Sequence, residues 1–307
     1  MSTYNGARFL DEQLESLINQ EIDSSKYKLE IYCRDDGSID STMKKLKKYA
    51  MRYGCIKVLD NSGQNLGVKL SFFSLLKSIE ADYYFFCDQD DIWNRNKVSI
   101  FMDESLKIND TIPGGMYSDL EVVDSNNVSV GNTMMSINNW KYGENRDFEF
   151  LFFKARVTGA AFAINRRARD MIIYIDDKEF SKVRMHDSII ALLISAFDNL
   201  HFIPKVTVRY RQHNDNVLGA TSKKKSLADI DFRRSTMRQC LGDLKVISTI
   251  LAESDISVEH RKALKAALKF YRTTGALQRL FLLTHDYRTL WNKIEFKRLI
   301  FFAFFYK

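Results

Sequence analysis

Cysteine is scarce in this sequence, and its spacing argues against cysteine-based sites. The 307 residues contain four cysteines, with no C-x-x-C pair and no Cys/His ligand spacing among them. Neither a zinc site nor a dithiol redox motif is therefore expected. Cys33 and Cys87 fall inside predicted strands, which indicates buried thiols in a reducing cytoplasm.

A long apolar run and a secretory start are also missing. No stretch reaches about eighteen consecutive apolar residues, so we expect no transmembrane helix. The first six residues include neither a basic nor an apolar region, which argues against a signal peptide. These features predict a cytoplasmic protein.

Charge is divided unevenly along the chain. Residues 221–307 carry 18 Lys and Arg against 8 Asp and Glu, whereas residues 1–220 carry 28 against 31. The C-terminal part is therefore basic, and the two parts are expected to meet different partners. The length allows one large domain plus an appendage, or two domains.

Residues 1–115 alternate predicted helices and strands. The predicted helices are 7–20, 41–53 and 68–80, and the predicted strands are 29–34, 56–59 and 83–87. This order predicts an α/β fold with a mostly parallel sheet and helices on both faces.

The pattern changes after residue 115. Shorter pieces at 115–118 and 157–164, a helix at 188–197 and strands at 200–203 and 206–211 indicate α+β additions to the sheet edge, where acceptors are usually recognised. The last part reads as helices at 233–251 and 258–280 and from 288 onward.

Acidic turns follow two of the predicted strands. Asp88-Gln89-Asp90-Asp91 comes directly after an aromatic run, and Asp35-Asp36 follows a strand of alternating pattern. Ligands bind at the carboxyl ends of strands in open α/β sheets. Clustered carboxylates repel one another, so a cluster that stays ionised needs a cation such as Mg²⁺ or Mn²⁺. The alternative is simple capping, with Asp91 capping a helix at 94–108.

Six short motifs then appear in a recognisable order. They are Ser2-Thr3-Tyr4-Asn5-Gly6, Arg34-Asp35-Asp36-Gly37-Ser38, Asn65-Leu66-Gly67, Asp88-Gln89-Asp90-Asp91-Ile92-Trp93, Met185-His186-Asp187 and Tyr210-Arg211-Gln212-His213-Asn214. The chain resembles family 2 glycosyltransferases with the GT-A fold, most of all the bacterial rhamnosyltransferase-like branch that builds cell-wall and capsular polysaccharides. Each motif alone is weak, whereas six in order are specific.

The resemblance implies a Rossmann-like mixed sheet with a C-terminal helical extension, divided into three parts. Residues 1–115 would bind a nucleotide sugar linked to dTDP or UDP, residues 116–220 would bind the acceptor, and residues 221–307 would form a basic helical region. The implied reaction is metal-dependent, inverting transfer of a sugar to a glycan or polyprenyl-linked acceptor.

The resemblance also assigns individual residues. Those implied to bind the nucleotide or donor are Thr3, Tyr4, Asp35, Asp36, Asn65, Gly67, Lys69, Asp88, Gln89 and Gly159. Asp88 and Asp90 match the D-x-D motif and would bind Mn²⁺ or Mg²⁺, with His213 as a further metal ligand or phosphate contact.

Asp187 matches the catalytic base of inverting members. Here His186 stands where the family usually has Glu, a departure shared with the rhamnosyltransferase-like branch. The alternative is that Asp187 merely caps the helix that follows.

The chain ends in an apolar stretch flanked by basic residues, 297–307. This tail is too short to span a bilayer and suits the interface, so docking on the inner face of the membrane is one expectation. Packing on the catalytic domain or in a homodimer is the other. No nucleic-acid motif accompanies the basic charge, so no nucleic-acid partner is expected.

Two other function classes remain open. A D-x-D phosphatase or phosphotransferase would use Asp88 as nucleophile and Asp90 as acid, although no later Lys or Asp-Asp motif supports it. A non-catalytic nucleotide-sugar-binding protein would need Asp187 only as a cap.

The start of the chain departs from the family pattern. Members begin with an apolar strand before the Ser2–Gly6 segment, so either the recorded start is late or the sheet lacks a strand.

Overall fold

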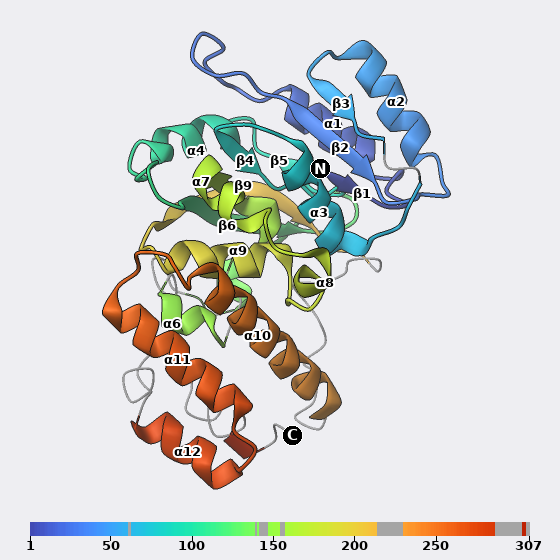
Figure 1. Cartoon of the computed structure of the whole chain (residues 1–307). Helices are drawn as coiled ribbons and strands as arrows, with labels where there is room; N and C mark the ends of the chain where they lie inside the picture. Colours follow the sequence, from blue (N-terminus) through green and yellow to red (C-terminus); the bar gives the residue numbers. More distant parts are fainter. Residues whose placement is uncertain are drawn as a thin grey trace.

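The structure is a computed structural model, and it describes residues 1–60, 63–138, 140, 147–153, 157–213, 230–285 and 303–304, without the side chains of 230–234. The chain forms sheets at one end and a helical region at the other (Figure 1). Helix α9 (His186–Ser195) lies between them and is apolar around its whole circumference, because it packs on elements of both regions.

A small parallel sheet is built from the first part of the chain. Its strands are β1 (Ser2–Thr3), β2 (Ile31–Asp35) and β3 (Ile56–Val58), in that order. Helices α1 (Leu10–Ile18) and α2 (Thr42–Arg52) provide the crossovers that parallel neighbours require. The predicted alternation of helices and strands is therefore confirmed here.

The second sheet is mixed, with order β4-β8-β6-β9-β5 and β7 paired to β6. Its strands are β4 (Tyr83–Phe85), β5 (Ile92–Trp93), β6 (Gly115–Val123), β7 (Ser129–Thr133), β8 (Phe162–Asn165) and β9 (Leu200–Arg211). Only β6 and β9 pair in parallel. The mixed sheet that the family resemblance implies is thus confirmed. The mostly parallel sheet predicted for residues 1–115 holds for β1–β3 but not for β4, because β8 inserts between β4 and β6 in the opposite direction.

The two strands expected at 200–203 and 206–211 are one strand, β9. The register between β6 and β9 shifts around Asp119, opposite the point where Pro204 interrupts the apolar pattern. Proline has no N–H to donate to a strand ladder, so a bulge accommodates it without ending the strand.

Helices α4 (Lys97–Ser105) and α7 (Arg166–Ile172) pack on the second sheet, whereas α3 (Gly67–Ser78) contacts β1 and β2 of the first sheet and also α9. Four one-turn elements complete this part of the chain. They are α5 (Met134–Ile137), α6 (Phe148–Leu151), η1 (Gly159–Ala161) and α8 (Asp177–Phe180).

The C-terminal region consists of α10 (Ile230–Ile250), α11 (Val258–Arg272) and α12 (Ala276–His285). One helix was expected over 258–280, but α11 ends where Thr273 adopts an extended conformation. The buried Arg279 side chain donates to the carbonyl oxygen of Thr273 at 2.5 Å and thereby stabilises the turn. No helix among the described residues is long and apolar enough to cross a membrane.

A cavity of about 520 Å³ separates the two sheets. Met1, Ile31 and Tyr32 line one side of it, and Tyr84 and Phe86 line another. β1 pairs only with Arg34 and Asp35, and β4 is the last strand of its sheet. Within the described residues the sheet is therefore interrupted between β2 and β4, which is compatible with both alternatives considered from the sequence, a late start or a lost strand.

Candidate active site

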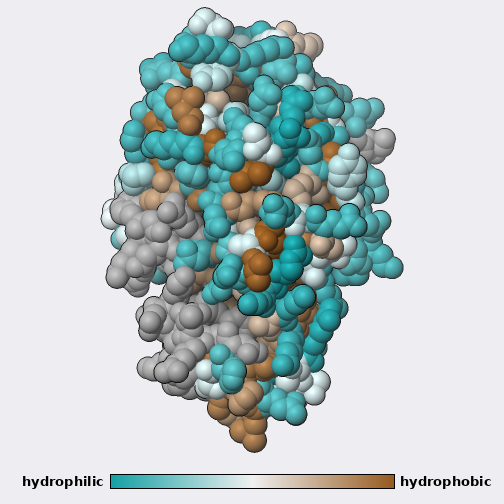
Figure 2. Space-filling view, turned by 60° about the vertical axis from the view of Figure 1, so that its left-hand side comes forward, coloured by the Kyte–Doolittle hydropathy of each residue, from teal (hydrophilic) through white to brown (hydrophobic). Residues whose placement is uncertain are grey.

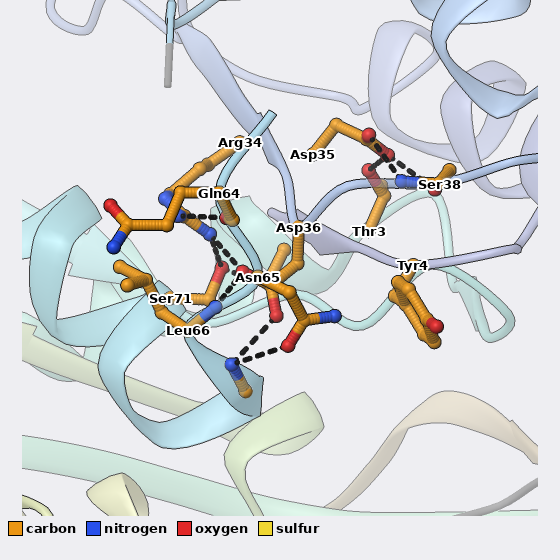
Figure 3. A network of polar contacts seen from close by, with 12 residues as sticks. Thr3, Tyr4, Arg34, Asp35, Asp36, Ser38, Gln64, Asn65, Leu66 and Ser71 are labelled. Atoms are coloured by element: carbon orange, nitrogen blue, oxygen red, sulfur yellow. Dashed lines mark hydrogen bonds and ion pairs between the residues drawn. The ribbon is translucent and has the colours of Figure 1, made fainter. Parts of the chain in front are cut away.

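The carboxyl ends of β1 and β2 meet at Thr3 and Asp35. The Thr3 hydroxyl donates to Oδ1 of Asp35 at 2.9 Å, so the predicted neighbours lie together despite the short first strand. Ser38 donates from its backbone N–H to Oδ2 at 2.9 Å and from its hydroxyl to Oδ1 at 2.5 Å. Figure 3 shows this cluster beside a second one formed by Asp36.

Asp36 links β2 to the start of α3. Its Oδ1 accepts from the buried Arg34 guanidinium at 2.5 Å and from the Leu66 N–H at 2.8 Å, and Oδ2 accepts from the Gly67 N–H at 2.8 Å (Figure 3). Gly67 has φ +75°, a conformation that favours glycine. Asn65 Oδ1 also accepts from the Gly67 N–H, at 3.2 Å. Asp36 therefore fixes the loop that carries two predicted donor-binding residues.

Gln89 joins the second acidic turn to Tyr4, the neighbour of Thr3. Its side-chain oxygen accepts from the Tyr4 N–H at 2.7 Å, and its side-chain nitrogen donates to the Tyr4 carbonyl at 2.9 Å. The Tyr4 ring is 49% exposed and points away from Asp35 in Figure 3. The two acidic turns thus lie on one rim, as the sequence predicts.

Asp88 and Asp90 follow β4 on this rim. Oδ2 of Asp90 lies 2.8 Å from Nε2 of His213, two residues beyond β9. Burial, together with the charges of Asp90 and Asp187, raises the pKa of the half-buried Asp88 to about 7. The three carboxylates, far apart in sequence, therefore share one electrostatic environment.

The side chains of Asp88, Asp90 and His213 could bind a divalent cation that also has ligands from a bound substrate. Two cis ligands of an octahedral ion at about 2.1 Å lie about 3 Å apart, close to the separation of Asp90 and His213. No group of three or more such side chains converges on one point within the described ranges. Mg²⁺ is commonly held by one or two carboxylates together with water and substrate phosphates.

Asp91 does not cap a helix, contrary to the alternative considered from the sequence. It is buried, and Oδ1 accepts from the Arg211 N–H at 3.0 Å. Burial raises its pKa well above the usual range, and Asp90 and Asp88 add to the effect. β5 occupies the residues after Asp91, and α4 starts only at Lys97.

The sequence did not indicate that Arg211 holds the acidic loop in place. Its buried guanidinium donates to Oε2 of Glu12 at 2.6 Å and to the Asp90 carbonyl at 2.9 Å. It therefore fixes the backbone that presents Asp90. Arg211 stands two residues before His213 in a quoted motif, but only the pairing of β5 with β9 shows that it lies behind the acidic loop.

Asp187 lies in the first turn of α9. Oδ2 accepts from the Gly159 N–H at 2.8 Å, and Oδ1 accepts from the Ser188 N–H at 2.6 Å. The N-cap position is Met185. Asp187 thus accepts one N–H of its own helix and also reaches across to η1, which a purely capping residue would not do.

His186 supports Asp187 from the apolar side. Its ring stacks on Phe72 with centroids 4.1 Å apart and lies 5.2 Å from the ring of Phe86. Burial lowers the pKa of His186, against the opposing charge of Asp187. The imidazole is therefore packed like an aromatic core residue.

Lys97 is a second residue that the sequence did not reveal. Its buried ammonium donates to the Ala160 carbonyl at 2.6 Å and lies 3.4 Å from the centre of the Trp93 ring. Burial lowers the pKa of Lys97 to about 7, although Cys87 and Asp91 oppose that shift. Lys97 and Asp187 therefore hold η1 from its two sides.

Lys69 lies differently from the expectation. Its ammonium donates to the carbonyl oxygens of Ser181 and Val183, at 2.6 and 2.8 Å. Burial lowers its pKa. Lys69 thus fixes the segment that leads into α9, and one of its three N–H donors remains beyond these two bonds.

Comparison with known proteins shows to which protein family the chain belongs. The sequence profile described as Glycosyl transferase family 2 matches residues 1–172, more than half of the chain. The chain belongs to glycosyl transferase family 2. This family 2 glycosyltransferase is 26% identical over 229 residues to the dTDP-rhamnosyl transferase RfbG of Shigella flexneri, covering 72% of this chain and 74% of RfbG. It is 32% identical to the poly(ribitol-phosphate) beta-glucosyltransferase of Bacillus spizizenii over 88 residues, 29% of this chain and 14% of that protein.

Solved structures share the fold of this family 2 glycosyltransferase. TarS 1-349 from S. aureus, in complex with UDP-GlcNAc, aligns with a TM-score of 0.55 and 18% identity over 98% of this chain and 77% of the TarS chain. The mannosyltransferase PcManGT from Pyrobaculum calidifontis, in complex with GDP-Man and Mn2+, aligns with a TM-score of 0.50 and 16% identity, over 98% and 84% of the two chains. The predicted GT-A fold is confirmed.

Proposed function

We propose that this glycosyltransferase moves a sugar from a nucleoside-diphosphate donor, dTDP-rhamnose or a UDP-hexose, with inversion at the anomeric carbon. One observation carries the proposal: the ring of His186, the neighbour of Asp187, lies 5.2 Å from the ring of Phe86, two residues before Asp88, so the candidate base and the D-x-D motif lie close together. Gln89 attaches this site to the Thr3–Asp35 cluster through the backbone of Tyr4.

The nucleotide would bind at the ends of β1 and β2. Thr3 and Asp35 can accept from a pyrimidine N–H or from ribose hydroxyls, and the exposed Tyr4 ring can stack on the base. Asp35 and Asp36 each accept three hydrogen bonds from protein groups, so each would have at most about one acceptor position left for the nucleotide. Because two of the bonds to Asp36 come from the N–H groups of Leu66 and Gly67, Asp36 would also shape the Asn65–Gly67 loop. The remaining N–H of Lys69 would reach toward the diphosphate.

Asp88, Asp90 and His213 would hold Mn²⁺ or Mg²⁺ together with the diphosphate of the donor. A divalent ion there would neutralise charge that develops on the leaving diphosphate. Arg211 would keep the backbone of Asp90 in place while the donor enters. The chain's own acidic cluster thus provides carboxylate oxygens where the diphosphate would lie.

Asp187 would act as the general base. It takes the proton of the acceptor hydroxyl while that oxygen forms a bond to the anomeric carbon. The bond from this carbon to the diphosphate oxygen breaks, and the nucleoside diphosphate leaves with the electron pair. A single displacement of this kind inverts the anomeric centre. Gly159, which has no side chain, would allow the donor sugar to approach the backbone.

The relatives indicate the class of substrate. RfbG is named a dTDP-rhamnosyl transferase, and TarS was solved with UDP-GlcNAc. We propose a glycan or polyprenyl-linked acceptor in surface polysaccharide synthesis, bound by residues 116–220 beside the donor half at 1–115. The boundary to the basic region is proposed near residue 220. Light scattering of the full chain measures whether it forms a homodimer through residues 221–307.

A thermal-shift panel tests the donor site. UDP, dTDP, GDP and CDP are each added with and without Mn²⁺ or Mg²⁺ to the wild type and to Asp90→Ala. We expect metal-dependent stabilisation by one pyrimidine nucleotide, and its loss in the variant, because a ligand stabilises only the form that binds it. If no nucleotide stabilises the wild type, the proposed donor site is wrong.

Product analysis separates the remaining function classes. A glycosyltransferase releases the nucleoside diphosphate when donor and acceptor are both present. Phosphate release from simple phosphomonoesters would instead favour the phosphatase class. Nucleotide binding without transfer to any acceptor tested would favour a binding protein.

We also propose that the protein works at the inner face of the membrane through its tail, 297–307. Of this tail the structure describes residues 303–304, where Ala303 is buried and Phe304 is 47% exposed. Co-flotation with anionic vesicles, with and without residues 297–307, tests the tail. Equal flotation of both forms would exclude a role for it.

A further inference from the structure

Helix α11 carries a line of cations at the end of the molecule opposite the first sheet (Figure 1). Lys262, Lys265, Lys269 and Arg272 are all exposed. Because an α-helix turns roughly 100° per residue, this spacing keeps the four within about 80° around the helix. None of them forms an ion pair with any residue in the part of the chain that the structure describes.

Helix α12 has an exposed apolar edge, formed by Leu277 and Phe281. Leu277 and Phe281, one helical turn apart, are 75% and 64% exposed, while Leu282 and Leu283 face the core. Figure 2 shows hydrophobic residues at the tip of the molecule where α12 lies. Bonds from the Arg279 side chain to the turn before α12 hold this edge in a fixed relation to α11.

The C-terminal end of the line of cations lies near the apolar edge. Arg272 and Leu277 are five residues apart, so their Cα atoms lie within about 19 Å. Glu259 is the only acidic residue between Val258 and His285, and it lies in the first turn of α11, away from α12. The surface therefore combines uncompensated positive charge with large apolar side chains.

We propose that this α11–α12 surface docks on an anionic lipid membrane. The four cations would contact lipid headgroups, and Leu277 and Phe281 would enter the boundary with the acyl chains. A second copy of the chain fits less well, because a symmetric contact would bring the same cations together. A nucleic acid offers phosphates to the cations but no apolar layer to the α12 edge.

Membrane docking by this surface is tested separately from the tail and from sugar transfer. Ala303 of the tail accepts a hydrogen bond from the Arg279 side chain of α12 at 3.3 Å, whereas the cations and the apolar edge belong to α11 and α12 themselves, so the variants below leave the tail unchanged. The experiment below measures lipid binding alone, so its failure would leave the proposed transferase activity untouched, and a failed nucleotide panel would leave the docking surface untouched.

Flotation of the full chain tests the surface. Phosphatidylcholine vesicles with and without about 30% phosphatidylglycerol are compared at about 0.1 M and 0.5 M salt, because salt screens headgroup charge. The charge variant is Lys262→Gln/Lys265→Gln/Lys269→Gln. Its matched control is Lys44→Gln/Lys47→Gln/Lys48→Gln, which removes three exposed lysines from α2 at the opposite end of the molecule.

The apolar variant is Leu277→Ser/Phe281→Ser, matched by Met51→Ser/Leu106→Ser at two residues that are 83% and 81% exposed. We expect both test variants to partition into anionic vesicles roughly tenfold less or weaker still, while both controls bind like the wild type. Wild-type binding should fall at the higher salt concentration and in neutral vesicles.

Three results would overturn the proposal. They are equal flotation of the charge variant and the wild type, equal binding to neutral and anionic vesicles, or a lower molecular mass of the apolar variant in light scattering without any change in flotation. The last result would assign the α12 edge to a contact between two copies.

Discussion

The backbone N–H of Gly159 donates to Oδ2 of Asp187 over 2.8 Å, joining η1 to the first turn of α9. On the other side of η1, the buried Lys97 ammonium donates to the carbonyl of Ala160. A Cβ on Gly159 would lie 3.4 Å from Oδ2 of Asp187 and 3.2 Å from Nε2 of His186. The carboxylate of Asp187 is therefore oriented by backbone and packing that leave little space around it.

Replacement of this carboxylate should separate catalysis from binding. Asp187→Asn keeps the shape of the side chain but removes the basic oxygen, so kcat should fall roughly 10²-fold or more. The Kd for the nucleoside diphosphate should stay near the wild-type value, because the proposed nucleotide contacts lie at β1 and β2. Steady-state kinetics and calorimetry measure the two quantities.

Asp198→Asn is the matched control, because Asp198 is 78% exposed beyond the C-terminal end of α9. Its kcat should equal that of the wild type. If Asp187→Asn retains more than about a tenth of wild-type kcat, Asp187 is not the general base.

Asp36 should matter mainly for stability. Asp36→Ala would leave the buried Arg34 guanidinium without its carboxylate and two N–H groups without their acceptor. Loss of one partner of a buried ion pair typically costs about 3 kcal/mol, so urea unfolding should show a decrease of that size in the free energy of unfolding.

The exposed Asp103 provides the comparison, since Asp103→Ala should change the unfolding free energy by less than about 0.5 kcal/mol. A stable Asp36→Ala protein that has lost only nucleotide affinity would contradict the structural role and favour direct contact with the ribose.

The sequence predicted the features that depend on local pattern. The ends of β2 and β4 could be placed from the apolar runs before Asp35 and Asp88, and their meeting on one rim follows from sheet geometry. The order of motifs then identified the family, as the profile match confirms. Asp187 could be placed at a helix start for the same local reason.

What the sequence did not predict depends on contacts between distant segments. Lys97 reads as an ordinary helical lysine until η1 is placed beside it, 63 residues later. Arg211 supports the Asp90 backbone from 121 residues away. The antiparallel insertion of β8 has the same origin, because a buried strand shows its apolar run but not the direction of its neighbours.

Lys97 should make stability depend on pH. Its pKa is about 7 in the folded protein and about 10.5 in an unfolded chain. Between these values the unfolded chain binds a proton that the folded protein does not, so this group makes stability rise with pH. The contribution should approach about 1.4 kcal/mol per pH unit, and Lys97→Met should remove it.

Urea unfolding at three pH values between about 7 and 9 measures this difference. Lys44→Met, at an exposed position of α2, should keep the wild-type slope. Parallel slopes for the wild type and Lys97→Met would show that Lys97 stays protonated in the folded protein. Lys97→Met should also lower kcat, because η1 loses one of its two anchors.

The cavity between β2 and β4 makes a prediction about the N-terminal strand. An extension of five Val and Ile residues placed before Met1 would continue β1 over about 17 Å, along the part of β2 that β1 leaves unpaired. Apolar residues such as Ile31, Phe72 and Phe86 line this space and would be covered. Each buried Val or Ile contributes about 1.5–3 kcal/mol, against about 1–2 kcal/mol for ordering its backbone.

The extended chain should therefore unfold at a higher urea concentration than the present one, by about 2 kcal/mol or more in free energy. A five-residue Gly and Ser extension is the control, because it adds the same backbone without apolar side chains and should change stability little. If both extensions raise the free energy of unfolding equally, the gain comes from backbone pairing with β2 and not from filling of the cavity by apolar side chains. If neither does, the β2 and β4 edges do not accept a strand between them.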